Sequence, residues 1–71
     1  MLSNTDKINI IDQRIYVINE YISNINSYQA SLDIEDQAYL DKNSGYSQLL
    51  IDYARSILAL EEEKKSLTNP I

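Results

Sequence analysis

Isoleucines recur along the first third of this chain in alternating steps of three and four residues. Residues with this spacing share one side of an α-helix, so the pattern predicts an apolar seam. With the first isoleucine at heptad position a, the alternation continues through Gln29, Leu32, Asp36 and Tyr39. This unbroken phase predicts one helix over about residues 5–40, roughly 50 Å long. The isoleucines are Ile8, Ile11, Ile15, Ile18, Ile22 and Ile25.

Residues that favour helix N-caps occur at the start of this helix and again at Asp33. Ser3, Asn4 or Thr5 can cap the first free N–H groups, and an acidic residue follows them. The weak point is the stretch 31–33, where Asp33 could cap a new helix, with Asp36 three residues further on. We favour the continuous helix, because a break at this place is not expected to preserve the heptad phase.

The only glycine closes the segment DKNSG, in which all five residues favour turns or tolerate a left-handed backbone. We therefore predict a loop at 41–45, with Asp41, Asn43 and Gly45 as its turn residues and Asn43 or Gly45 at positive φ. The segment begins like a calcium loop but places the glycine where an EF-hand needs a ligand. A plain loop without a metal is the better interpretation.

The helix expected after this loop covers about residues 46–68. Two helices joined by so short a loop pack antiparallel. The sequence thus predicts an all-α fold, a two-helix antiparallel coiled-coil hairpin forming a single domain over 1–71. Its core is expected to consist of the facing seam residues of both helices. They are Ile25, Leu32, Tyr39, Tyr46, Leu50, Tyr53, Ile57 and Leu60.

A turn at 41–45 makes the first helix much longer than the second, so its N-terminal isoleucines lack a partner in their own chain. A chain of 71 residues without cysteine is too small to be stable on a modest core and has no disulfides. We expect a homo-oligomer, with a dimeric four-helix bundle favoured over a trimer, although isoleucine at both a and d favours coils of three or four strands. The interface residues are Ile8, Ile11, Ile15, Ile18 and Ile22.

Polar and aromatic positions in the seams allow two interpretations each. Gln29 and Lys64 occupy a positions, where polar residues can set register; equally, they can mark where burial thins out. Tyr21 and Tyr28 share one heptad position, and Tyr39, Tyr46 and Tyr53 repeat in steps of seven. A platform for stacking nucleic-acid bases is conceivable, but without interleaved arginine we expect residues at the edge of the core, with their hydroxyls in water.

Composition narrows the possible functions. The net charge is −5 and the six basic residues are scattered, which argues against nucleic acid and anionic membranes as partners. The chain has no histidine and no cysteine, so we expect neither an enzyme nor a cofactor or metal site. The start MLSNTDK does not resemble a signal peptide, and no apolar run is long enough for a bilayer span.

The opening MLSNTDKINIIDQRI, the isoleucine-rich helix, a short polar loop and the closing EEEKKSLTN resemble small helical-hairpin proteins of tailed marine cyanophages. The loop differs, because DKNSG replaces the proline-containing turn expected of that family. The resemblance implies a viral accessory or virion protein, in the host bacterial cytoplasm or the virion, and assigns no site residues.

Together these features predict a non-enzymatic assembly, structural or accessory protein that acts through coiled-coil self-association and contacts with other proteins. The alternative is a small regulator or inhibitor that binds a host or phage enzyme through one helix face. The two differ in what covers the isoleucine seam: a copy of the same chain, or another viral or host protein.

Overall fold

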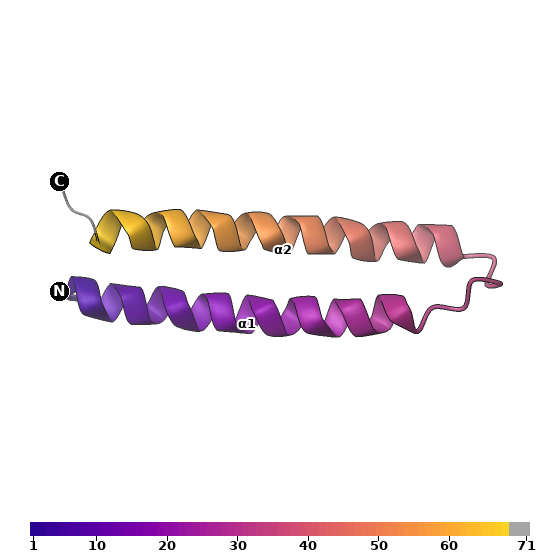
Figure 1. Ribbon diagram of the computed structural model, residues 1–71, viewed down its shortest axis with the longest axis horizontal. Helices are drawn as coiled ribbons and strands as arrows, with labels where there is room; N and C mark the ends of the chain where they lie inside the picture. Colours follow the sequence, from indigo (N-terminus) through magenta and orange to yellow (C-terminus); the bar gives the residue numbers. More distant parts are fainter. Residues whose placement is uncertain (69–71) are drawn as a thin grey trace.

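The computed structural model describes residues 1–68, which form two helices lying side by side in opposite directions (Figure 1). Helix α1 spans Asn4–Ala30 and helix α2 spans Tyr39–Thr68. The molecule is a rod of 54 × 18 × 16 Å, with both helix ends furthest from the turn at one tip. The predicted all-α helical hairpin is confirmed.

Helix α1 begins with a capping box. The Ser3 hydroxyl accepts the N–H of Asp6 at 3.1 Å, and the Asp6 carboxylate accepts the N–H of Ser3 at 3.4 Å. Two N–H groups that the first helical turn leaves without a carbonyl partner are thereby satisfied. Asp6 also places negative charge at the positive end of the helix dipole. Of the three candidate caps, the structure selects Ser3.

Helix α1 ends at Ala30, and the prediction of one helix over 5–40 is wrong. The physical reason is a pair of consecutive turns that each begin with an aspartate. The Asp33 carboxylate accepts the N–H of Glu35 at 2.9 Å, and the Asp36 carboxylate accepts the N–H of Ala38 at 2.8 Å. Such local bonds compete with helical hydrogen bonds and stabilise a turn. The connection between the helices is therefore 31–38.

The predicted loop at 41–45 is also wrong, because these residues lie inside α2. Asp41 is in the first helical turn, where the dipole favours a carboxylate. Asn43 accepts a hydrogen bond from the opposite helix through its side chain. No residue within 1–68 has positive φ, so neither Asn43 nor Gly45 adopts the left-handed conformation expected of them. Space around Gly45 is open, and nothing in the structure explains glycine at this helical position.

Moving the turn changes which residues face each other. The rings of Tyr21 and Tyr53 pack with centroids 5.8 Å apart, whereas a turn at 41–45 would have placed Leu32 opposite Tyr53. At the far tip, the Asn4 side-chain amide donates to the Leu67 carbonyl at 3.5 Å. Helix α2 therefore covers the whole of α1. The expectation that the N-terminal isoleucines lack a partner in their own chain is wrong.

The core is a single seam between the two helices. Ile11, only 3% exposed, is the one buried residue among those described. The other seam residues of α1 and α2 are half-buried, because two helices can cover each other on one side only. The half-buried apolar residues of the seam are Ile8, Ile15, Ile18, Ile22, Ile25, Leu32, Tyr39, Tyr46, Leu50, Tyr53, Ile57, Leu60 and Leu67.

Candidate interaction surface

Many large hydrophobic side chains of the hairpin are exposed to solvent. Soluble monomers expose single hydrophobic residues commonly but contiguous apolar patches rarely. Here the exposed large hydrophobic side chains outnumber the single buried one many times over. They are Met1, Leu2, Ile10, Tyr16, Val17, Tyr21, Tyr28, Ile34, Leu40, Leu49, Ile51 and Leu58.

Two tyrosine pairs bridge the helices along one side of the rod. Tyr21 packs on Tyr53, and Tyr28 packs on Tyr46 with ring centroids 6.2 Å apart. Both pairs are tilted, by 39° and 33°, within the range of favourable aromatic contacts. Tyr21 and Tyr28 are about half exposed, so each pair shows one ring to solvent.

The same side of the rod extends towards the free ends of the helices. Val17 and Ile10 precede Tyr21 by one and three helical turns, which keeps them on its side of α1. On α2, Leu49 lies within one turn of both Tyr46 and Tyr53. We call this surface the tyrosine face. It comprises Ile10, Val17, Tyr21 and Tyr28 of α1 with Tyr46, Leu49 and Tyr53 of α2.

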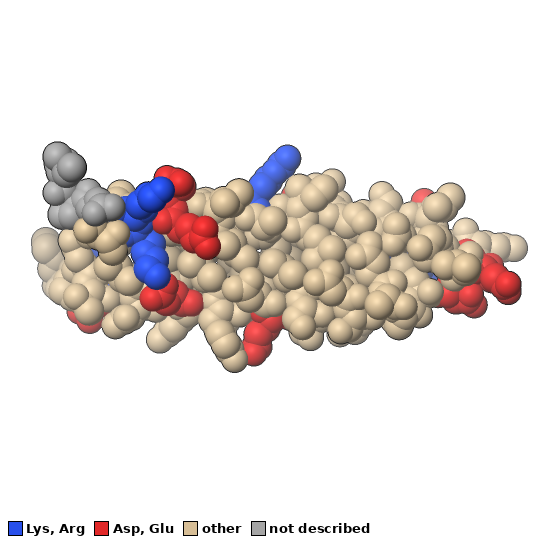
Figure 2. Space-filling view, viewed as in Figure 1, with Lys and Arg blue, Asp and Glu red and all other residues tan. Residues whose placement is uncertain are grey.

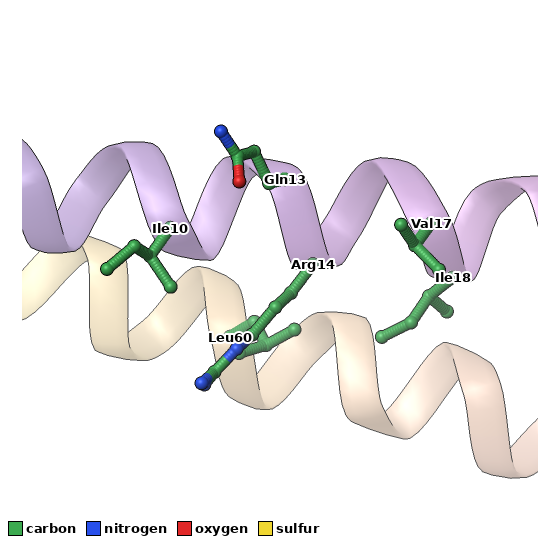
Figure 3. A pocket seen from close by; sticks show the side chains of 6 residues that line it. All are labelled: Ile10, Gln13, Arg14, Val17, Ile18 and Leu60. Carbon is green, nitrogen blue, oxygen red and sulfur yellow. The ribbon is translucent and has the colours of Figure 1, made fainter.

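A groove of about 460 Å³ opens between the helices next to the tyrosine face (Figure 3). Its apolar lining consists of the exposed Ile10 and Val17 and the half-buried Ile18 and Leu60. Arg14 reaches from α1 across to α2 beside Leu60, whereas Gln13 points away from α2. This groove gives access to the seam. Its mostly aliphatic lining suits an apolar side chain from another helix better than a polar small molecule.

Near the turn, the seam contains a polar layer instead of an apolar one. The Gln29 amide nitrogen donates to the Asn43 amide oxygen at 2.9 Å and to the Ser47 hydroxyl at 3.0 Å. All three side chains are partly buried, where unpaired polar groups would be costly. The bonds favour the interpretation of Gln29 as a register-setting residue, since only this alignment of the helices satisfies them.

Charges are concentrated towards the two tips of the rod. Asp12 and Lys64 pair at 2.7 Å towards the free ends, and Asp36 and Lys42 pair at 2.9 Å next to the turn. Between these tips, α1 from residue 16 to 30 has one charged residue, and α2 from 43 to 59 has two. Figure 2 shows one broad face of the rod, on which the central part carries few charges. A weakly charged centre is suited to contact with another surface.

The second polar residue at an a position is Lys64. Its ammonium group leaves the seam to meet Asp12 on α1, and both side chains remain partly exposed. Ion pairs of this kind contribute little to stability, at most about 1 kcal/mol. Lys64 is half-buried between the equally half-buried Leu60 and Leu67, so burial does not decrease at its position. It differs from Gln29, which takes part in a partly buried hydrogen-bond network.

Few groups have a perturbed pKa. The Lys42 ammonium, followed by the N–H of Ala38, lowers the pKa of Asp36. In turn, the Asp36 carboxylate raises the pKa of Lys42. The pKa of Tyr16 is raised by its hydrogen bond to Glu20 and by the charge of that carboxylate. These groups are exposed and belong to ion pairs or local bonds, so they indicate structural pairing and no general acid or base.

The sequence-predicted residues fall into three groups. All five proposed interface isoleucines face α2, and their use as an oligomer interface stays a prediction. The eight predicted core residues are half-buried, although Leu32 lies in the connection. Asp41, Asn43 and Gly45 are helical and do not form the turn.

Sequence reasoning missed the groove and the contribution of Ile10, Val17 and Arg14 to it. The signal that could have found them is the step of seven between Ile10 and Val17, which directly precede the d residues Ile11 and Ile18. Ile10 and Val17 form a second apolar stripe on α1, separate from the isoleucine seam.

Within residues 1–68, no cluster of three or more acidic, histidine or cysteine side chains could hold a metal ion. A search of the same residues found no helix with the length and apolar character needed to cross a membrane.

No protein-family model matches the chain, and comparisons with curated proteins and with solved structures gave no match. What the chain does must therefore be inferred from its own surface.

Proposed function

We propose that this chain is a non-enzymatic assembly protein that binds a second copy of itself through the tyrosine face. The observation that carries the proposal is the half-open seam: within residues 1–68 one residue is buried, and large apolar side chains line the flank next to it. Burying a Val, Leu or Ile side chain contributes about 1.5–3 kcal/mol. A second hairpin laid on the tyrosine face would bury several such side chains at once.

The dimensions of the hairpin support a second copy as the occupant. The whole rod is 54 Å long and 18 Å wide, so one of its broad sides is large enough for the ~800 Å² that each partner buries in a standard protein interface. Two hairpins packed in this way form an antiparallel four-helix bundle, in which every helix has two neighbours. The low charge of the central region also reduces repulsion between two chains of net charge −5.

Other features support a binding role over catalysis. The chain has neither histidine nor cysteine, and its perturbed carboxylate pairs with a lysine at the turn. With the resemblance to cyanophage proteins, the proposed setting is a phage-infected bacterium, in its cytoplasm or in the assembled virion. The rival role, a regulator of a host or phage enzyme, would use the same apolar face for a different partner.

The test is a pair of double substitutions measured by light scattering across a dilution series. Val17→Lys with Leu49→Lys places one charge on each helix of the tyrosine face. Tyr16→Lys with Ile51→Lys is the matched control, because it also replaces one exposed apolar residue per helix, away from that face. Lysine makes the chain less negative, so general repulsion between acidic chains cannot explain dissociation.

We expect the wild type and the control to be dimers, and the tyrosine-face variant to be a monomer that retains its helicity by circular dichroism. A wild type that is monomeric at every concentration contradicts self-association and favours the regulator. Equal dissociation of both variants would show that the tyrosine face is not the interface.

A further inference from the structure

The heptad frame of α1 continues through the connection and into α2. Asn43 lies four residues after Tyr39 and three before Tyr46, so the alternation from Ile8 to Leu67 is never interrupted. A closed hairpin makes no use of this continuity. When a chain reverses direction, the phase of its second helix is independent of the first, because the connection can have any length that closes the turn.

The connection itself is compatible with a helix. Residues 31–38 contain neither glycine nor proline, and no residue within 1–68 has positive φ. Leu32, Glu35, Gln37 and Ala38 are good or adequate helix formers. The turn is held by the side-chain bonds of two aspartates, and loss of those bonds would leave a sequence able to continue the helix.

We propose that residues 31–38 are a hinge through which two copies of this chain exchange α2, each becoming one long helix in an antiparallel two-stranded coil. This goes beyond the proposed function, because the exchanged dimer uses the seam and not the tyrosine face. Every contact between α1 and α2 in the hairpin recurs between the two copies. A short connection that can straighten is a recognised route to such exchange.

The register of the hairpin supports this geometry. Tyr21 and Tyr53 are placed symmetrically about residue 37, and so are Tyr28 and Tyr46. An antiparallel coil of two straight helices with the same pairs has its twofold axis near residue 37, within the connection. No slip of register is needed to pass from the closed form to the exchanged one.

Asp36 holds the hairpin closed. Its carboxylate accepts the N–H of Ala38 at 2.8 Å and the ammonium group of Lys42 at 2.9 Å. A continuous helix breaks both bonds, because Lys42 would then lie about 9 Å further along the axis. Asp36 would also occupy an a position, where the coil would partly bury its charge. Leucine at this position removes the closing bonds and adds an apolar seam residue.

The experiment compares Asp36→Leu with Glu35→Leu, which removes the neighbouring carboxylate but leaves both aspartate bonds in place. Each protein is unfolded, refolded at high concentration and measured by light scattering and small-angle X-ray scattering. We expect Asp36→Leu to form a dimer of roughly 100 Å, the length of one helix over residues 4–68. This is about twice the 54 Å of the hairpin. Glu35→Leu is expected to match the wild type.

A proline substitution in the connection tests the hinge by blocking the continuous helix. The Asp36 N–H donates to the Asp33 carbonyl at 3.0 Å, which makes Ile34 the second residue of a four-residue turn. Proline suits this position and interrupts a continuous helix. We expect Ile34→Pro to abolish the long dimer, both alone and combined with Asp36→Leu.

The outcomes separate this inference from the proposed function. Compact dimers of hairpin length in every variant support the tyrosine face and overturn the exchange. A long dimer that Ile34→Pro removes supports the exchange even if the lysine variants of the tyrosine face have no effect. Should Asp36→Leu fail to fold, the wild type decides: refolded at high concentration, it must yield some long dimer that Ile34→Pro removes, and its absence overturns the exchange.

Discussion

The carboxylate of Asp36 lies 2.9 Å from the ammonium nitrogen of Lys42, six residues further along the chain. Six residues of continuous helix rise about 9 Å, so this ion pair forms only where the chain bends. The pair therefore reports whether the turn is closed. It also lowers the pKa of Asp36 below its ordinary value of 3.8.

Acidification should weaken the turn. Because the pKa of Asp36 is lower in the folded chain, its contribution to stability is complete above 3.8 and is lost as the pH falls through the folded value. We expect the melting-temperature difference between the wild type and Asp36→Asn to shrink in that acid range. Circular dichroism melts from neutral to acid pH measure it. Glu35→Gln, which keeps the Lys42 pair, should follow the wild-type profile; a constant difference for Asp36→Asn would contradict the assigned role.

Ile11 should be the most sensitive apolar position. Its side chain is 3% exposed, whereas that of the adjacent Ile10 is 37% exposed. We expect Ile11→Ala to lower the free energy of unfolding by about 2–4 kcal/mol, through lost burial and the cavity left behind. Ile10→Ala, the control, should cost less than about 1 kcal/mol. Urea denaturation at low protein concentration measures both, and equal losses would show that the seam is not closed around Ile11.

Gly45→Ala should stabilise the hairpin. The glycine lies inside α2 without positive φ, and apart from its chain neighbours and the surrounding helical backbone no atom lies within 4 Å of the place where a Cβ would stand. Alanine is favoured over glycine in a helix by about 1 kcal/mol. The neighbouring control Ser44→Ala is expected to gain only a few tenths of that value. A melting temperature that falls in Gly45→Ala would place residue 45 in a turn after all.

Gln29 and Asn43 should be energetically coupled. Removal of Gln29 leaves the Asn43 amide oxygen without this bond, and removal of Asn43 leaves the Gln29 amide with its bond to Ser47 alone. A double-mutant cycle with alanine at both positions is expected to give a coupling of about 0.5–1.5 kcal/mol, with little dependence on salt. The exposed pair of Asp12 and Lys64 is the comparison, since its smaller coupling should fall as salt is added. Additive effects of the two substitutions would show that Gln29 does not set the register.

The parts of the fold that follow from helical periodicity could be predicted. The seams of both helices, including the buried Ile11 and the half-buried Tyr53, match the least exposed positions of the structure because burial repeats with the helical turn. The hairpin was predicted from two such helices joined by a short loop, and it is confirmed although the loop was placed at the wrong residues.

The position of the turn could not be predicted in this way. Phase continuity across 31–38 favoured a continuous helix, and turn-forming residues at 41–45 favoured a loop. Two local carboxylate bonds, from Asp33 and Asp36, outweighed both. Propensity counts residue types one at a time, whereas these bonds depend on the spacing of an aspartate and an N–H two residues later. That error hid the partner of the N-terminal isoleucines and placed the candidate surface on the seam, whereas the structure leaves the flank of the seam exposed.

The contact between Asn4 and the Leu67 carbonyl brings the outer ends of both helices together at one tip of the rod. The 31–38 connection lies at the opposite tip, 54 Å being the full length of the molecule. A molecule fused before α1 and another fused after α2 would therefore be held next to each other. The rod would project from the point where the two fused molecules meet, with the proposed hinge at its free end.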